Sequence, residues 1–314
     1  MRIKKTYVWI IGLVVFGFVL TKVNVGDIFV IFSGIRVFYI AFAFLLTIPL
    51  IAIKAYRWKY LLKMQDIDYS FKTTFLAYLT SMYLGIITPG RAGELIKGFY
   101  VKNDKNVSLG KAFSSVLVDR LFDLFVLITL GCLGLAIFSL PKQQSLAILA
   151  VVSVIILATG ILLSKKLARR AVQFVYKRTM LRSYKEKIDE SVDDFYSGIE
   201  ELKKLRLVIP LLTTVFAYLL FYTQGYLIAK SLNIPIPFFY LVFCISLVSL
   251  VALIPISISG IGTRDVTLIV LFSAQGLTKE AAVSLSLTLL FVFWVSVGGM
   301  GALAWLKRPL NLNI

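Results

Sequence analysis

The sequence predicts an all-α polytopic membrane protein with about six full transmembrane helices and two re-entrant helical hairpins in an inverted repeat. Three observations lead to this prediction: long apolar runs, basic segments between them, and two similar Pro/Gly turns inside apolar segments. Of the 314 residues, 59% are hydrophobic and 16% are charged, whereas soluble domains are about 45–50% apolar and about 25% charged. A run of roughly 20 apolar residues spans a bilayer as a helix.

The apolar segments are the candidate helices. Strands of a membrane barrel alternate apolar and polar residues, and these runs do not alternate. In lipid, a run of this kind must pair its backbone groups internally, which an α-helix does. The segments are 6–20, 37–53, 71–88, 113–140, 145–163, 207–229, 238–257, 266–274 and 281–306.

The net charge of +18 comes from Lys and Arg residues that cluster between the apolar runs. Such clusters mark cytoplasmic loops and attract anionic lipid headgroups. We therefore expect membrane lipids as partners and no nucleic acid. The pattern predicts a multi-pass protein of the plasma membrane with both termini in the cytoplasm, and a retained first helix in place of a cleaved signal peptide. The basic segments are 1–5, 54–72 and 164–206.

The basic segments also indicate that two apolar segments do not cross the membrane. If every apolar segment before residue 164 crossed, the strongly basic segment 164–206 would lie outside, against the positive-inside rule. The conflict disappears if segment 71–88 enters the membrane, turns at Thr88-Pro-Gly90 and returns to the cytoplasmic side. Segment 238–274 turns in the same way at 255–262 and enters from the opposite face.

The two hairpins resemble each other, which indicates an internal repeat. Each follows an Ile-x-x-x-Phe pattern, turns where Pro and Gly precede an Arg and an acid, and leads into a long apolar helix with glycines near its end. This is the pattern of an inverted-repeat transporter, with its site near the midplane at two broken helices. We expect one membrane domain over 1–314, a first repeat of about 37–140, a second of about 207–306, and a cytoplasmic basic amphipathic linker at 164–206.

Two features of the sequence leave alternatives open. The linker carries twelve Lys or Arg and seven Asp or Glu residues, and its apolar residues recur at three- and four-residue steps. This spacing fits amphipathic helices on a membrane surface, and a plain solvated linker helix fits equally well. Glycines 298, 299 and 301 serve either internal packing or a homo-oligomer.

The first hairpin tip carries charged residues in an apolar setting, where each costs about 2.5–3.5 kcal/mol to insert and usually has a function. Arg91 and Glu94 are three residues apart and share a helix face, while Gly90 and Gly93 allow a turn and a close approach to a ligand. A half-helix beginning near Gly90 points N–H groups at the membrane interior, which suits a phosphate. Arg91 adds a bidentate donor, and Glu94 holds Arg91 or binds a cation. A purely structural pair is the alternative.

The second tip follows the same logic, because Arg264 and Asp265 follow Gly260 and Gly262. Supporting residues come from two predicted spans. Asp119, Arg120 and Asp123 share one region of a span and fit either a scaffold or a site. Arg57 fits a snorkelling interfacial belt, with contact to a lipid headgroup as the alternative.

Enzymatic motifs are absent from the sequence. There is no Gly-x-Ser-x-Gly elbow, His-Glu-x-x-His motif or P-loop, and no histidine. The two cysteines lie in apolar runs and fit small hydrophobic roles. We therefore predict no catalytic residue, no metal and no cofactor, and a transporter in place of an enzyme. A membrane glycosyltransferase would use Asp119 and Asp123 with a metal, and Arg120 between them disfavours it.

Three motifs resemble the transmembrane region of the lysylphosphatidylglycerol synthase family: Pro89-Gly-Arg-Ala-Gly-Glu94, Val118-Asp-Arg-Leu-Phe-Asp123 and Gly260-Ile-Gly-Thr-Arg-Asp265. The resemblance covers about residues 6–306. The chain departs from the family at Arg264-Asp265, where the family usually has Arg-Glu. Full-length members add a soluble aminoacyl-transferase domain, which we do not expect here.

The resemblance implies a lipid flippase, which moves a phospholipid, an aminoacylated phospholipid or a polyprenyl-linked lipid between leaflets. The alternative is a membrane-embedded lipid-modifying transferase, similar to the synthase or associated with a glycosyltransferase. Carried over by motif, the residues that line or support the cavity are Arg91, Glu94, Arg120, Asp123, Arg264 and Asp265.

Overall fold

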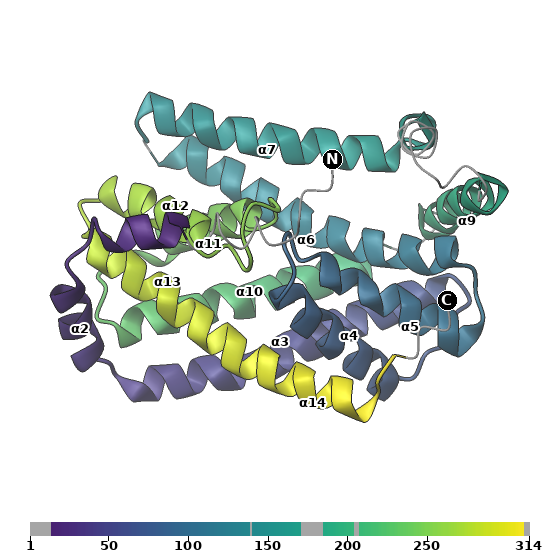
Figure 1. Ribbon diagram of the computed structural model, residues 1–314, viewed down its shortest axis with the longest axis horizontal. Coiled ribbons are helices and arrows are strands. Elements are labelled where there is room, and N and C mark those ends of the chain that lie inside the picture. The colour runs from purple at the N-terminus through teal and green to yellow at the C-terminus, as the bar shows by residue number, and fades with distance from the viewer. Residues whose placement is uncertain (1–13, 139, 171–184, 204–206, 311–314) are drawn as a thin grey trace.

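The computed structural model describes residues 14–138, 140–170, 185–203 and 207–310 (Figure 1). These residues form helices and no β-strand, and five helical segments are long and apolar enough to cross a membrane. The all-α polytopic fold is therefore confirmed. The five segments are α3 (Val37–Met64), α6 (Leu109–Ile137), α7 (Lys142–Leu163), α10 (Val208–Ser231) and Lys279–Lys307, which joins α13 (Lys279–Phe293), a π-helical turn (Trp294–Gly298) and α14 (Gly299–Lys307).

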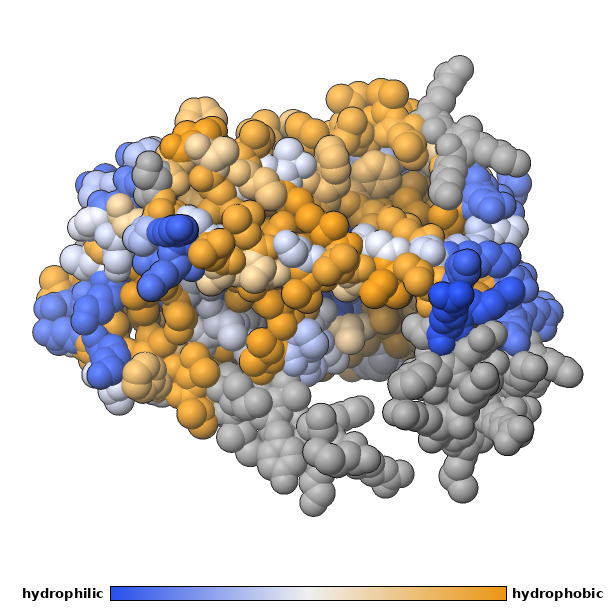
Figure 2. Space-filling view, turned by 90° about the horizontal axis from the view of Figure 1, so that it is seen from above, coloured by the Kyte–Doolittle hydropathy of each residue, from blue (hydrophilic) through white to orange (hydrophobic). Residues whose placement is uncertain are grey.

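The surface matches a membrane-embedded bundle. On the face seen in Figure 2, apolar side chains form a wide band across the middle and hydrophilic ones gather at both ends. The long helices run roughly along the axis that joins these two ends (Figure 1). An apolar band between two polar ends is what a bilayer and its two interfaces require.

The N-terminal helical segment is broken. Val14–Leu20 is followed by α2 (Val25–Ser33) at an angle of 83°. The side chain of Asn24 caps α2 by accepting a hydrogen bond from the Gly26 N–H at 2.9 Å. The predicted first span, 6–20, begins outside the described residues. Helix α2 was not predicted, because its nine residues are too few to span a membrane as a separate apolar segment.

Two pairs of short helices form the predicted hairpins. In the first, α4 (Phe71–Ile86) is followed by a 3₁₀ turn (Ala92–Leu95) and α5 (Ile96–Lys105). With 16 residues, α4 is about 24 Å long, short of the roughly 30 Å hydrocarbon core. The second consists of α11 (Phe238–Val251) and α12 (Thr263–Ser273). In Figure 1, α4 and α5 occupy one end of the bundle and α11 and α12 the other, so the hairpins point toward each other.

The hairpin tips meet inside the bundle. Pro89 of the first tip and Ile258 of the second form an isolated antiparallel β-bridge. The Ser259 hydroxyl also donates a hydrogen bond to the Ile86 carbonyl at 2.7 Å. Gly90 turns the first tip with a φ of 59°, and Arg91 follows in the same left-handed region at 57°. A non-glycine residue adopts this conformation at a steric cost, so the surrounding contacts hold the tip in shape.

The span after each hairpin packs on the other hairpin. A Cβ on Gly134 of α6 would lie 2.0 Å from the Phe243 ring of α11, and a Cβ on Gly301 of α14 would lie 2.5 Å from Tyr83 Cβ of α4. Glycine at these positions is what allows the helices to approach. Gly301 therefore serves internal packing, one of the two roles that the sequence left open.

Matching local features flank the two hairpins. Asp66 after α3 has a φ of 58°, and Asn233 after α10 has a φ of 54°. The side chain of Ser108 caps α6 and that of Thr278 caps α13, each accepting from the N–H three residues on. In addition, α3 packs along α10. The two halves thus share turns and caps in the same order along the chain.

Helix α9 (Lys185–Lys203) packs on the N-terminal part of α6. A Cβ on Gly110 of α6 would lie 2.2 Å from the Ser191 carbonyl oxygen, and one on Gly198 would lie 2.3 Å from Ser114 Oγ. The described part of the linker is therefore not a plain solvated helix, because it buries Tyr196, Ile199 and Leu202. The apolar residues Val172 and Val175, which the amphipathic prediction also used, lie outside the described residues.

Candidate functional site

Arg57 of α3 is fully buried between two aspartates of α6. Its Nε lies 2.8 Å from Asp119 Oδ1, and its Nη1 lies 2.9 Å from Asp123 Oδ1 and 2.8 Å from Thr214 Oγ1 of α10. The prediction that Arg57 snorkels to the interface is wrong. The helix continues to Met64, so Arg57 stays inside the bundle, where its guanidinium binds carboxylates in place of lipid headgroups.

Two lysines complete the same cluster. Lys97 of α5 is fully buried; its ammonium contacts the Asp119 carboxylate and lies 4.3 Å from the centroid of the Tyr78 ring. Lys54 Nζ lies 3.0 Å from Asp123 Oδ1. Lys97 was not predicted as a site residue. It lies in the returning limb of the predicted first hairpin, three residues after Glu94. A lysine is costly to insert at such a position, and this cost is the signal that could have identified it.

Glu94 of the first tip holds two arginines. Its carboxylate contacts Arg120 of α6, and its Oε1 lies 3.7 Å from Arg91 Nη1. Only 4% of Glu94 is exposed, and Gly85 of α4 makes room for it, because a Cβ there would lie 2.5 Å from Glu94 Cγ. Of the roles predicted for Glu94, the geometry matches the one that holds Arg91.

Arg264 of the second tip makes its hydrogen bond to a residue outside the cluster around Arg57. Its Nε donates to Ser286 Oγ of α13 at 2.7 Å, and that hydroxyl contacts the Asp265 carboxylate. Asp265 also accepts from the Gly262 N–H at 2.8 Å and so caps α12. Only 8% of Arg264 is exposed, and among the described residues its Nη2 has no hydrogen-bond partner.

The predicted free N–H groups at the first half-helix end are already bonded. The N–H groups of Arg91, Ala92 and Glu94 donate to carbonyls of the turn, and that of Gly93 donates to Thr88 Oγ1 at 2.7 Å. The prediction that this end offers backbone donors to a phosphate is wrong for this conformation, because the tight turn uses them. Side chains therefore supply the donors for any anion at this tip.

The glycines of the tips shape the backbone. A Cβ on Gly93 would lie 2.2 Å from the Leu84 carbonyl oxygen, so the two limbs of the first hairpin touch at Gly93. Gly260 and Gly262 have φ values of 74° and 83°, which other residues rarely adopt. The sequence predicted that Gly93 allows a close approach to a ligand; in the structure Gly93 instead lies close to the backbone of Leu84.

Two adjoining cavities lie where the hairpins meet. One, of about 130 Å³, is lined by charged residues Lys54, Arg91, Arg120 and Asp123. The other, of about 90 Å³, is lined by Arg91 and Arg264. Both share Arg91, whose guanidinium lies 5.3 Å from the centroid of the Phe293 ring. The walls common to both cavities are Arg91, Phe221, Gln224, Ser249 and Phe293.

Arg91 and Arg264, one from each tip, line the same cavity. Lys54, Arg120 and Asp123 also face these cavities. Other predicted site residues do not line them and stand behind the wall or shape the turns: Arg57, Gly90, Gly93, Glu94, Asp119, Gly260, Gly262 and Asp265.

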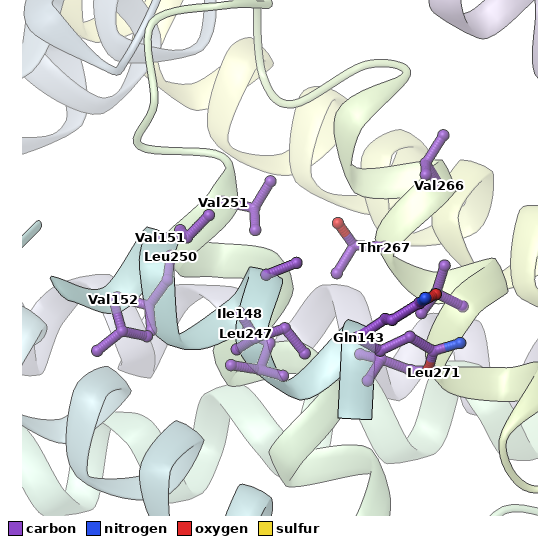
Figure 3. A pocket seen from close by; sticks show the side chains of 13 residues that line it. Gln143, Ile148, Val151, Val152, Leu247, Leu250, Val251, Val266, Thr267 and Leu271 are labelled. Carbon is purple, nitrogen blue, oxygen red and sulfur yellow. The ribbon is translucent and has the colours of Figure 1, made fainter. Parts of the chain in front are cut away.

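A third cavity, of about 380 Å³, has a different chemistry. It lies between α7, α11 and α12 (Figure 3). Ile148, Leu247 and Leu250 point into it, and Gln143, Gln144 and Thr267 are its polar residues. Among the described residues that line it, none is charged. The mostly apolar walls suit hydrocarbon and offer no cationic partner for a phosphate.

Comparison with known proteins agrees with this architecture. Residues 7–301 match the family model described as the lysylphosphatidylglycerol synthase TM region. A UPF0104 membrane protein of Methanocaldococcus jannaschii is 26% identical over 99% of this chain and 98% of its own length. One from Pyrococcus horikoshii is 27% identical over 88% of this chain and 89% of its own length.

A more distant similarity is to the glycosyltransferase AglD of Haloferax volcanii. It is 22% identical over 70% of this chain and 41% of its own length. No solved structure matches the chain.

Proposed function

The chain belongs to the lysylphosphatidylglycerol synthase TM-region family, and from this premise we propose that it is a lipid flippase. Its substrate is a phospholipid or another lipid with a phosphate-bearing headgroup, including aminoacylated and polyprenyl-phosphate lipids. One observation carries the proposal: an arginine from each of two opposed hairpin tips lines a cavity at the point where the tips meet. A polar cavity at broken helices inside a bundle is where transporters bind their substrates.

The cavity chemistry fits a phosphate group. Arg91 and Arg264 present planar guanidinium groups, which bind phosphate through paired hydrogen bonds. Lys54 and Arg120 add positive charge on the adjoining wall. The lipid tails remain in the surrounding hydrocarbon, so only the headgroup needs a polar path. The two hairpins then expose the headgroup to each leaflet in turn, in a plasma membrane with both termini cytoplasmic.

A proteoliposome assay tests this proposal. Purified protein is reconstituted into vesicles that contain a fluorescent phospholipid, and leaflet exchange is measured by dithionite quenching of the label that reaches the outer leaflet. We expect Arg91→Ala and Arg264→Ala each to slow exchange at least about tenfold, since a hydrogen bond to a charged group contributes about 1.5–3 kcal/mol. Arg36→Ala is the matched control, because Arg36 is exposed at the end of the bundle. Exchange that survives both cavity substitutions contradicts the proposed site.

The similarity to AglD supports a second candidate function for this chain, that of a lipid-modifying transferase. The same vesicles distinguish it: new headgroup chemistry on the labelled lipid, detected by mass spectrometry with pure protein and an activated sugar donor, favours the transferase. Leaflet exchange of the unchanged lipid favours the flippase.

A further inference from the structure

The charges around the two cavities do not balance. Six cationic side chains belong to the site: Lys54, Arg57, Arg91, Lys97, Arg120 and Arg264. Four carboxylates face them: Glu94, Asp119, Asp123 and Asp265. Six cations against four carboxylates leave a surplus of two positive charges. Arg264 is buried, whereas Arg91 and Arg120 are partly exposed. A cleft lined by one sign of charge attracts ligands of the opposite sign, and a ligand with two negative charges would match this surplus.

The surplus is concentrated on the cavity walls. Four cations line the two cavities, and Asp123 is the one carboxylate among the described lining residues. Behind the wall, Glu94 contacts Arg91 and Arg120. Asp119 pairs instead with Arg57 and Lys97, and Asp265 with the Ser286 hydroxyl and the Gly262 N–H. A ligand in the cavity therefore meets positive charge on several sides, and its own charge supplies the missing counterpart.

An unused donor points to the same ligand. Arg264 is more than nine-tenths buried and lines the smaller cavity, while its Nη2 has no hydrogen-bond partner among the described residues. A buried polar group without a partner costs about 1–3 kcal/mol, more when it is charged. A phosphate oxygen in the cavity would accept this hydrogen bond, and Arg91 lies on the wall shared with the larger cavity.

Cavity size limits what the headgroup carries besides phosphate. The cavities measure about 130 and 90 Å³, whereas pockets for drug-sized ligands measure about 300–1,000 Å³. A bare phosphate suits this space better than a phosphate esterified to a second, bulky group. An aminoacylated headgroup also adds positive charge to a site that already has a surplus.

Resting on the proposed function, we infer that the lipid headgroup is a terminal phosphate monoester with two negative charges. A phosphodiester headgroup carries one negative charge and leaves half of the surplus unneutralised. The same charge pattern would attract free inorganic phosphate, so the test must separate the two sources.

The test is equilibrium binding to the full chain in detergent, followed by the exchange assay described above. Two short-chain probes differ only at the headgroup: dihexanoyl phosphatidate, a monoester, and dihexanoyl phosphatidylmethanol, a diester. At pH 7.5 we expect the monoester to bind at least about tenfold more tightly, a difference of about 1.4 kcal/mol. Equal binding overturns the inference. Inorganic phosphate that competes as strongly as the monoester also overturns it, because the lipid part would then contribute nothing.

The pH dependence gives a second readout. The second ionisation of a phosphate monoester has a pKa near 6, so the monoester loses one negative charge as the pH falls from 7.5 to 5. We expect its advantage over the diester to shrink by at least about threefold over this range. The ionisable groups that line the cavities are Lys54, Arg91, Arg120, Asp123, Tyr218 and Arg264. The chain has no histidine, the side chain that ordinarily titrates in this range. A constant ratio contradicts the inference.

A matched pair of variants tests the charge surplus. Ser249 lies on the wall shared by both cavities. Ser249→Asp adds a carboxylate there and reduces the surplus to one, so we expect monoester affinity to fall. Ser249→Asn adds nearly the same volume without the charge, so the two variants are compared with each other: Ser249→Asp should bind the monoester about tenfold more weakly than Ser249→Asn. Equal losses in the two variants contradict the inference.

The binding assay and the exchange assay distinguish failure of the headgroup inference from failure of the flippase proposal. If the monoester binds selectively and no lipid changes leaflet, the flippase proposal fails and the headgroup inference stands. If both probes move and bind equally, the flippase proposal stands and the headgroup inference fails.

Discussion

Replacing Asp119 with asparagine removes one negative charge from a fully buried cluster and leaves Arg57 and Lys97 without their shared counterion. Asparagine has almost the same shape, so the lost charge is the main change. Removing one partner of a buried ion pair typically costs about 3–5 kcal/mol. In domains of 150–250 residues, 1 kcal/mol corresponds to about 2–4 °C. We therefore expect the melting temperature of Asp119→Asn to fall by on the order of 10 °C.

Size-exclusion chromatography of the heated, detergent-purified protein measures this loss. Asp68→Asn is the control, because Asp68 is exposed in the loop before α4, and such substitutions usually stay within about 0.5 kcal/mol. Arg57 keeps Asp123 as a partner in Asp119→Asn, whereas Lys97 loses its carboxylate. Adding Lys97→Met removes that cation, so the double variant should be more stable than the sum of the single changes indicates. If Asp119→Asn melts together with the control, these residues do not form one stabilising cluster.

Three further predictions follow from the contacts described above. Gly93→Ala places a Cβ 2.2 Å from a backbone oxygen of α4 and should sharply reduce the yield of folded protein, whereas Gly298→Ala, with open space around its Cβ, should not. Single cysteines at the exposed positions Lys105 and Gln275, in a chain without its native cysteines, should react with a membrane-impermeant maleimide from opposite sides of oriented vesicles; reaction from one side would refute the opposed hairpins. The hydrogen bond from Lys165 lowers the pKa of Asp193, so its carboxyl NMR titration should have a midpoint below the ordinary value of about 3.9. At pH values above about 3.9 the ionised Asp193 carboxylate stabilises its contact with Lys165, and this stabilisation is lost as the pH falls through the lowered pKa. Lys165→Gln should raise the midpoint of the Asp193 titration.

The long spans and the hairpins were predictable because they depend on composition along the chain. Apolar runs placed four of the five spans to within a few residues at both ends, and the start of α3 as well; the basic linker indicated that not every run crosses. The turns at Pro89-Gly90 and Gly260 were predictable because few other residues adopt the required backbone conformation. The end of α3 was not predictable, because Arg57 lies inside the helix and its charge resembles that of a loop.

The partners within the buried cluster were not predictable from sequence. Arg57 and Asp119 are 62 positions apart, and no local spacing indicates that α3 turns this face toward α6. Lys97 was missed because a single lysine near the end of a short helix resembles an interfacial anchor. The sequence also does not tell whether the backbone N–H groups at the first tip are free or hydrogen-bonded, because this depends on which turn the chain adopts there.

The contact between the two tips has a mechanical consequence. The Ser259–Ile86 hydrogen bond and the short bridge between Pro89 and Ile258 join the two hairpins, so in the transport cycle that we propose, displacement of one hairpin would pull on the other. A typical intramolecular hydrogen bond contributes only about 0.5–1.5 kcal/mol net, which changes an equilibrium by about two- to thirteenfold. Such a latch opens and closes readily, and a ligand that prefers one position by a few kcal/mol sets which form dominates.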